Sequence, residues 1–175
     1  VESPGGAIWL REGDAFACAA AASYRGPRPM VDAGEPLIAF LQERGWVIDV
    51  AEWGAHPQRY DGLVLPAGLH AQDTAWLIVP LLLGHELLGF VVLERPLAPL
   101  PLDWEVRDLL KTGARQAASY VGVQRAVEEL VQARQFESFN RMSAFVVHDL
   151  KNLVAQLGLM TRNAQRHRDN PEFQA

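Results

Sequence analysis

The fold is decided by residues 75–93, which read AWLIVPLLLGHELLGFVVL. Two apolar runs flank the Gly84-His85 pair, and this arrangement predicts a hairpin of two strands that turns at these residues. Strands that are apolar almost throughout are typically covered on both faces. We therefore expect this hairpin to lie at the centre of a sheet and to be well buried.

The residues before this hairpin mix short apolar runs with frequent Gly and Pro, which predicts an α+β domain. Residues 6–10 and 15–19 flank a turn at residues 12–14, so an opening hairpin is expected. Residues 35–45 have Pro in the first turn and end on Gly, which predicts a helix. A further strand is expected at Trp46–Val50.

A change of pattern follows residues 95–102, where three prolines in eight residues mark a connection. Asp103 is a suitable N-cap, and no proline occurs from Trp104 to about His167, so a long helix is predicted, with a break as an alternative. Residues 170–173 repeat the start signal with Asn, Pro and Glu, which predicts the beginning of another helix.

Apolar and small residues recur along this helix at alternating steps of three and four, the pattern of a heptad seam. The seam residues are Phe136, Phe139, Ser143, Val146, Leu150, Leu153, Leu157, Met160 and Ala164. If the helix has no partner in its own chain, this narrow apolar stripe would remain exposed to water. We therefore expect two copies of the chain to form a homodimer along it.

Composition excludes several classes of function. The net charge of -5 is spread along the chain, so neither a nucleic-acid footprint nor a polybasic membrane patch is expected. The single cysteine, Cys18, has no partner for an internal disulfide, which favours a reducing, cytoplasmic location. His56, His70 and His85 have no carboxylate or cysteine at ligand spacing, so no metal site is expected.

No segment reaches the roughly 18 uninterrupted apolar residues of a membrane span. Because the chain begins at Val1 and stops after a fresh helix signal, we expect it to be a piece of a longer protein. Membrane association would then come only through segments upstream of Val1. The mixed domain offers no nucleophile and base pair, P-loop or dinucleotide fingerprint, so a small-molecule enzyme there finds no support.

His148 is the residue in the helix most suited to chemistry. With Val146 and Leu150 on the seam, His148 lies about 200° away from each and faces solvent. A lone histidine is more often structural or merely exposed, but its neighbours favour a reactive one. Asp149 can accept the proton of one ring nitrogen and keep the other nucleophilic, and Asn152 lies on the same face, where it can bind an incoming phosphate.

Residues 148–152, His-Asp-Leu-Lys-Asn, resemble the H-box of sensor histidine kinases, in which His148 would be the phosphorylated residue. Most members carry a proline after the Asn, whereas this chain has Leu153, so a straighter helix is expected. The wider run at residues 134–143, 155–157 and 170–173 resembles the histidine kinases that accompany PEP-CTERM/exosortase protein-sorting systems.

This resemblance implies a GAF sensory domain at residues 1–120, with an antiparallel sheet flanked by helices and a ligand that it does not name. It further implies a coiled-coil signalling helix at 121–140 and the first helix of a dimerisation and phosphotransfer domain at 141–175. The catalytic residues would be His148, Asp149 and Asn152.

The implied partners are an ATP-binding module, with ATP and Mg²⁺ bound outside these residues, and the receiver domain of a response regulator. Nothing after His148 is long enough to supply that module, so this piece alone is expected to be inactive as an enzyme. The alternative is a non-catalytic GAF module that binds a ligand and dimerises, in which His148→Ala would leave function intact.

Overall fold

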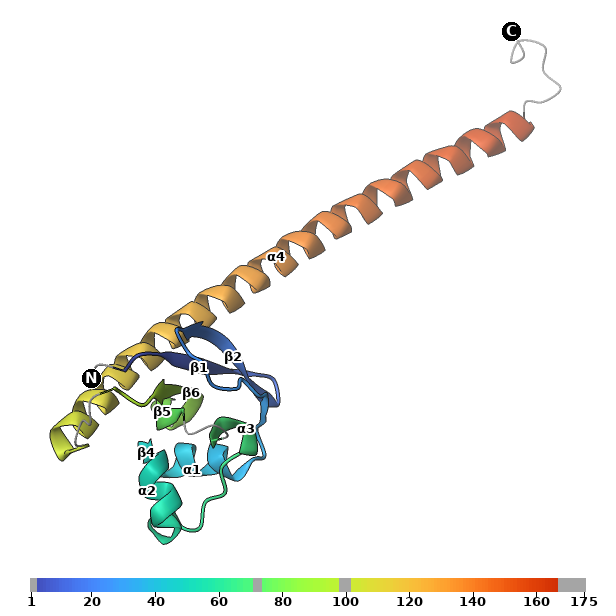
Figure 1. Cartoon of the computed structure of the whole chain (residues 1–175). Coiled ribbons are helices and arrows are strands. Elements are labelled where there is room, and N and C mark those ends of the chain that lie inside the picture. The colour runs from blue at the N-terminus through green and yellow to red at the C-terminus, as the bar shows by residue number, and fades with distance from the viewer. Residues whose placement is uncertain (1–2, 71–73, 98–101, 167–175) are drawn as a thin grey trace. The chain divides into compact units, whose positions relative to one another are not determined.

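A six-stranded antiparallel sheet forms the centre of the first part of the chain (Figure 1). The computed structural model describes residues 3–70, 74–97 and 102–166, and its chain divides into unit 1, Val1–Arg125, and unit 2, Ala126–Ala175. The strands are β1 Gly6–Glu12, β2 Ala15–Ala22, β3 Val31–Asp32, β4 Ile48–Asp49, β5 Ala75–Leu83 and β6 Glu86–Glu94. Their spatial order is β3-β2-β1-β6-β5-β4, so β1 and β6 are the central pair.

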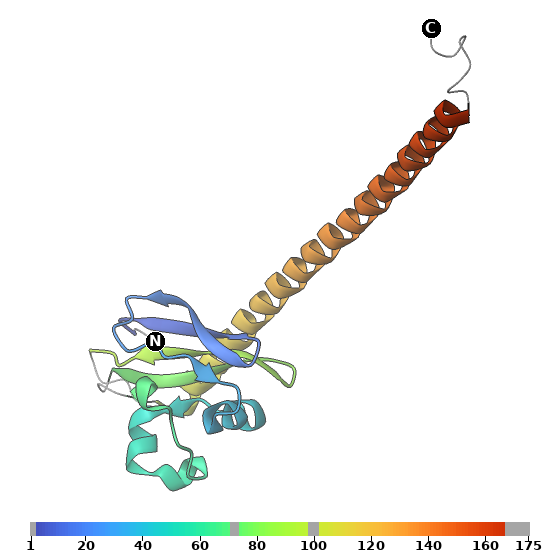
Figure 2. The same cartoon turned by 90° about the vertical axis from the view of Figure 1, so that its right-hand side faces the viewer.

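The helices of unit 1 lie on both sides of this sheet (Figures 1 and 2). On one side are α1 Pro36–Arg44, α2 Val50–Ala55, the 3₁₀ turn η1 Pro57–Tyr60 and α3 Ala67–His70. The other side is covered by the first part of α4, a helix that runs over Trp104–Arg166 and continues into unit 2. The two sheet faces therefore carry separate apolar clusters.

The predicted β5–β6 hairpin is confirmed. The two strands pair from Ala75↔Glu94 to Leu83↔Glu86, and the turn residue Gly84 has a positive φ of 63° that a glycine adopts without strain. Pro80 has no N–H to donate, and it lies beyond the end of β4, which pairs with β5 only at Leu77 and Ile78. The proline is tolerated because this part of β5 has one strand neighbour.

The opening hairpin and the helix at residues 35–45 are also confirmed. β1 and β2 pair on either side of Gly13-Asp14, and both extend beyond the residues predicted. α1 begins with Pro36 and ends at Arg44, and the next residue, Gly45, caps it: its left-handed φ of 60° lets its N–H bond to the Leu41 carbonyl.

The strand expected at Trp46–Val50 is wrong in its extent. β4 spans only Ile48–Asp49, because the Asp49 carboxylate caps the helix that follows, accepting from the N–H groups of Ala51 at 2.9 Å and Glu52 at 3.1 Å. The capped chain turns into α2 at Val50, a residue whose β-branched side chain suggested a strand.

The α1–α3 side of the sheet holds the larger core. Trp9 stacks on Phe90 with ring centroids 5.3 Å apart, and its indole N–H donates to the Pro29 carbonyl at 2.8 Å. Phe16 packs against the same Phe90 ring. All three aromatic side chains are fully buried, so they anchor the centre of the sheet to the connections around it.

The α4 side is packed with small helix residues. Leu110 and Ala114 contact the cluster around Leu77 and Val79, and Ala118 is fully buried. Gly122 lies so close to Leu83 that an added Cβ would fall within 2.7 Å of its side chain. These small residues let the helix axis approach the sheet closely.

The long helix forms without the break given as an alternative. Asp103 caps it as predicted, its carboxylate accepting from the Val106 N–H at 2.9 Å, and α4 continues through Leu153 to Arg166. The helix expected from Asn170 lies outside the described residues. Within the described residues, no helix is long and apolar enough to cross a membrane. The expected α+β class, with an antiparallel sheet, flanking helices and a long C-terminal helix, is confirmed.

The close packing of β6 on β1 yields the first prediction. An added Cβ at Gly89 would overlap the Trp9 carbonyl, which is backbone and cannot move aside. We expect Gly89→Ala to lower the free energy of unfolding by about 2 to 3 kcal/mol in urea denaturation. The control is Gly54→Ala, since nothing lies within 4 Å of that site. Equal stability of the two variants would contradict the packing described.

Candidate functional site

The three predicted site residues lie together on one exposed face of α4 in unit 2. The His148 Nδ1 atom is 3.3 Å from the Asn152 side-chain nitrogen and 3.5 Å from an Asp149 carboxylate oxygen. The His148 side chain is 72% exposed and that of Asp149 is 53% exposed. The helix therefore presents an imidazole whose Nδ1 edge faces two polar side chains and whose Nε2 edge faces solvent.

The two side chains next to Nδ1 favour different tautomers of the His148 imidazole. The Asp149 carboxylate, 3.5 Å from Nδ1, would favour a proton on that nitrogen, whereas the Asn152 N–H can donate only to an unprotonated Nδ1. The carboxylate is the stronger acceptor, and the Asn152 amide can turn by about 180° to offer its oxygen instead. A proton on Nδ1 would leave the Nε2 lone pair free, whereas a proton on Nε2 would leave Nδ1 as the acceptor.

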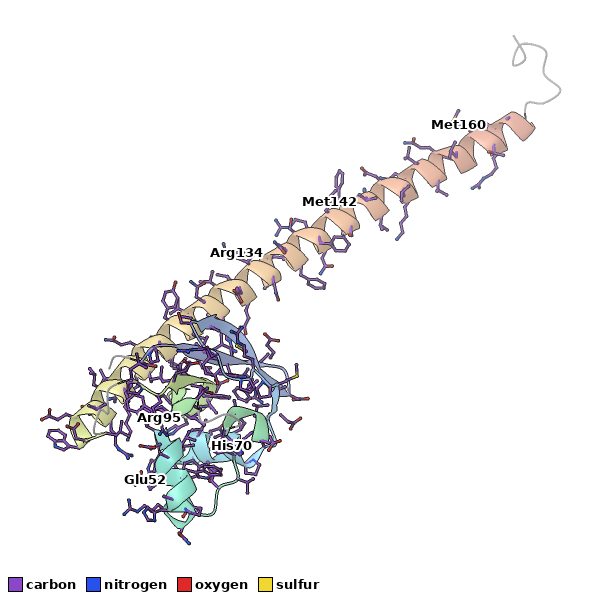
Figure 3. All side chains as sticks on the ribbon, viewed as in Figure 1. Glu52, His70, Arg95, Arg134, Met142 and Met160 are labelled. Atoms are coloured by element: carbon purple, nitrogen blue, oxygen red, sulfur yellow. The ribbon has the colours of Figure 1, made fainter. Side chains whose placement is uncertain are left out.

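The seam residues of unit 2 point away from this face. The large apolar ones are between 46% and 68% exposed in the single chain, and Met160 stands clear of the helix in Figure 3. They are Phe136, Phe139, Val146, Leu150, Leu153, Leu157 and Met160. A continuous exposed stripe of this size favours burial against another helix.

A polar network around Glu52 on α2 of unit 1 was not predicted from the sequence. Glu52, labelled in Figure 3, accepts from the Tyr60 hydroxyl at 2.8 Å, from Arg107 at 3.1 Å and from Arg59. These bonds, that from Tyr60 first, hold the pKa of Glu52 below its usual value. Burial, followed by the bond to Glu52, raises the pKa of Tyr60 to about 12. The network joins α2, η1 and the first turn of α4.

A second missed group is a pair of buried hydroxyls. Tyr24 Oη and Thr74 Oγ1 have no hydrogen-bond partner among the described residues, and both lie against Gly26. The buried Glu94 carboxylate is close by, and it accepts from the Arg25 N–H. Burial, with Glu94 adding to it, raises the pKa of Tyr24. These hydroxyls are candidates for holding a polar group in unit 1.

Metal ligands do not gather in the part of the chain that the structure describes, where no group of three His, Cys, Asp or Glu side chains could hold an ion. Cys18 is partly buried and packs against the core of unit 1, with its Sγ 3.6 Å from the Ala20 carbonyl oxygen. His70 ends α3 and lies against Trp53, with ring centroids 5.3 Å apart.

Comparison with solved structures identifies proteins of the same fold. The GAF domain/HD domain protein from Geobacter sulfurreducens has a TM-score of 0.55 at 15% identity, over 72% of this chain and 84% of that one. A methyl-accepting chemotaxis protein, residues 122 to 287, gives the same score and identity over 72% and 82%. The GAF domain of a phosphoenolpyruvate-protein phosphotransferase from Coxiella burnetii gives 0.52 at 21% identity, over 71% and 74%.

These similarities define the class of fold. No family model matches the chain, and no curated protein matches it. At identities of 15% and 21% the likeness concerns the fold alone, and it confirms the GAF-like sheet with flanking helices.

The Glu52 network yields a prediction about pH. A folded-state pKa below the usual 4.5 means that ionised Glu52 stabilises the fold above that pH, and that this stability is lost as pH falls through the folded value. We expect Glu52→Gln to lower the free energy of unfolding by about 1 kcal/mol at neutral pH. The difference from wild type should shrink towards zero in acid. Urea titrations across the pH range check this, with the exposed Glu43→Gln as control.

The geometry at His148 yields a prediction about its tautomer. In nitrogen-15 NMR spectra of the neutral imidazole, we expect wild-type His148 to carry its proton mainly on Nδ1. Asp149→Asn removes the carboxylate acceptor and should move the proton towards Nε2, while the His85 signals stay unchanged. A wild-type His148 already protonated on Nε2 would contradict the assignment.

Proposed function

We propose that this chain is the sensory and phosphoacceptor part of a sensor histidine kinase, with His148 as the phosphorylated residue. The observation that carries the proposal is the exposed imidazole on an unbroken helix, opposite an apolar seam, with an acid and an amide at Nδ1. A histidine that accepts phosphate from another module must be accessible and rigidly mounted. The 72% exposure of His148 and its place within the continuous helix α4 support this role.

The proposed chemistry uses the two ring nitrogens separately. Nε2 attacks the γ-phosphorus of ATP, the bond from that phosphorus to the ADP oxygen breaks, and Mg²⁺ bound with the nucleotide offsets the charge on ADP. Asp149 holds the Nδ1 proton and stabilises the positive charge that develops on the ring. In the second step an aspartate oxygen of a receiver domain attacks the phosphorus, and the N–P bond breaks. Asn152 orients the ring and can donate to a phosphoryl oxygen.

Two copies of the chain would form the working unit. The Phe136–Ala164 seam supplies the apolar surface for a homodimer in which each His148 faces outward, towards its own or its partner's ATP-binding module. We further propose that this phosphotransfer takes place in the cytoplasm. The residue resemblance at 134–143 and 155–157 supports a place among exosortase-associated kinases.

The GAF fold of unit 1 supports a sensory role. Proteins of the same fold include one described as a methyl-accepting chemotaxis protein. Because α4 both packs on the sheet and carries the phosphoacceptor segment, a change in unit 1 that alters the start of α4 can bias the access to His148. The same fold also accommodates the alternative function, a GAF module that binds a ligand and dimerises without phosphorylation.

Labelling with ATP separates the two functions. We expect protein made from the complete reading frame to take up the γ-phosphate of labelled ATP as a base-stable, acid-labile adduct. His148→Gln should abolish the label, because the accepting nitrogen is gone, while the matched exposed His85→Gln variant should keep it. A label that survives in His148→Gln, or none in a folded wild-type preparation, would favour the non-catalytic module.

A further inference from the structure

One edge of the sheet in unit 1 is open along most of strand β2 (Figure 1). β3, the strand outside β2 in the sheet order, has only two residues and pairs with Ala15 and Phe16. Residues 17–22 continue the ladder with β1, but in the described part of the chain no strand pairs with their outer side. We call residues 17–22 the open edge.

The backbone of the open edge indicates the kind of ligand that it can bind. Along an antiparallel strand the N–H and C=O groups point alternately to the neighbour on either side, so about half of these groups point away from β1. None of the backbone hydrogen bonds described outside the helices and ladders involves residues 17–22. A row of alternating donors and acceptors is matched in spacing by another extended chain, which can add to the sheet as a further strand.

The side chains of the open edge leave room for such a strand. All of them are alanine apart from Cys18, and those of Ala19–Ala22 are exposed. Charged side chains and prolines, which commonly protect edge strands from pairing, do not occur in this stretch. An added strand with larger side chains can therefore approach to hydrogen-bonding distance.

A groove beside the open edge supplies side chains for recognition. The groove has a volume of about 360 Å³ and is lined by residues 17–21 together with Arg28 and Met30 from the connection between β2 and β3. Met30 is 72% exposed. The exposed Arg28 donates to the Tyr24 carbonyl at 3.1 Å, and among the described side chains no carboxylate pairs with it.

These two side chains indicate the chemistry of the added strand. The Arg28 guanidinium, which has no acidic partner among the described residues, favours a carboxylate, because charge-assisted hydrogen bonds of this kind are the strong ones. Met30 offers a flexible apolar surface that adapts to different side chains. A strand with an acidic and an apolar residue facing the groove would satisfy both.

A second copy of the chain fits this edge less well than a different peptide. Two copies paired antiparallel through their open edges would be related by a twofold axis near the middle of the edge. Their two Arg28 guanidinium groups would then lie close together without a carboxylate. The β1–β2 register also shifts at Ala19, and a bulge of this kind disfavours regular pairing along the whole edge of an identical strand.

We propose that the open edge binds an extended, acidic peptide segment of another protein. The segment adds as a strand beside β2, with its backbone paired to residues 17–22 and a carboxylate at Arg28. This interaction goes beyond the proposed function. It uses neither His148 nor the Phe136–Ala164 seam, so it is independent of phosphorylation and of dimerisation along α4.

A fluorescent synthetic peptide tests the charge at Arg28. The probe is a peptide of about nine residues in which valine and glutamate alternate, and its binding is followed by fluorescence anisotropy. We expect Arg28→Glu to weaken binding at least about tenfold, because it places a like charge at the carboxylate. The matched control is Arg141→Glu, an exposed arginine of unit 2 that should leave the affinity unchanged. The unfolding midpoints of both variants verify that they fold.

Two methylated forms of the same peptide test the backbone pairing. One carries N-methyl groups on its valines and the other on its glutamates, so each lacks one alternate set of N–H donors. Because only one set faces β2 in an added strand, one form should lose binding and the other should keep it. Equal binding of both forms, no binding of the unmethylated peptide, or an equal affinity for Arg28→Glu would overturn the proposal.

Hydrogen exchange locates the peptide on the sheet. Saturating peptide should slow the exchange of backbone N–H groups within residues 17–22 and leave those of β4, at the opposite edge, unchanged. Protection of residues 17–22 that appears without peptide and rises with protein concentration would assign the edge to a second copy and would contradict the proposal. Protection confined to other parts of the chain would contradict it as well.

Discussion

Burial of the β5–β6 hairpin on both faces is the constraint on which the rest of unit 1 depends. Two adjacent strands made almost wholly of apolar residues cannot leave either face in water, so the chain must supply a cover on each side. The aromatic cluster around Trp9 and Phe90, closed by α1 to α3, covers one face. The small residues of α4 cover the other, which is why the helix that leaves the domain is tied to its central sheet.

The apolar residues of α4 have different surroundings in unit 1 and in unit 2. In unit 1 it buries small residues such as Ala114 and Ala118 against the sheet, while Tyr120 and Val123 on another side stay exposed. In unit 2 the large apolar residues of the helix, such as Leu150 and Leu157, are exposed along one seam. One helix can carry both arrangements because it has 3.6 residues per turn, so different positions in the sequence lie on different faces of the helix.

The chemistry proposed for His148 depends on local helix geometry and not on a pocket. Residues one and four positions further along place a carboxylate and an amide at the same ring nitrogen, so the site is assembled by one turn of helix. Such a site is exposed, so in the proposed function another module would have to bring the phosphate donor to it. The absence of a proline at position 153 keeps the helix bonds continuous beneath it.

The sequence by itself determined the features that arise from short-range periodicity: the β5–β6 hairpin, the capped α1, the start of the long α4 at Asp103 and the direction of His148 away from the seam. Each depends on backbone preferences or helix phase within a few residues. Only the tertiary structure decided the short β4, where the Asp49 cap overrides β-branched neighbours, and the Glu52 network, whose members Tyr60 and Arg107 are 8 and 55 residues away. It also decided which side of α4 the sheet buries, because contacts between distant segments depend on how whole elements pack, and no local pattern records that.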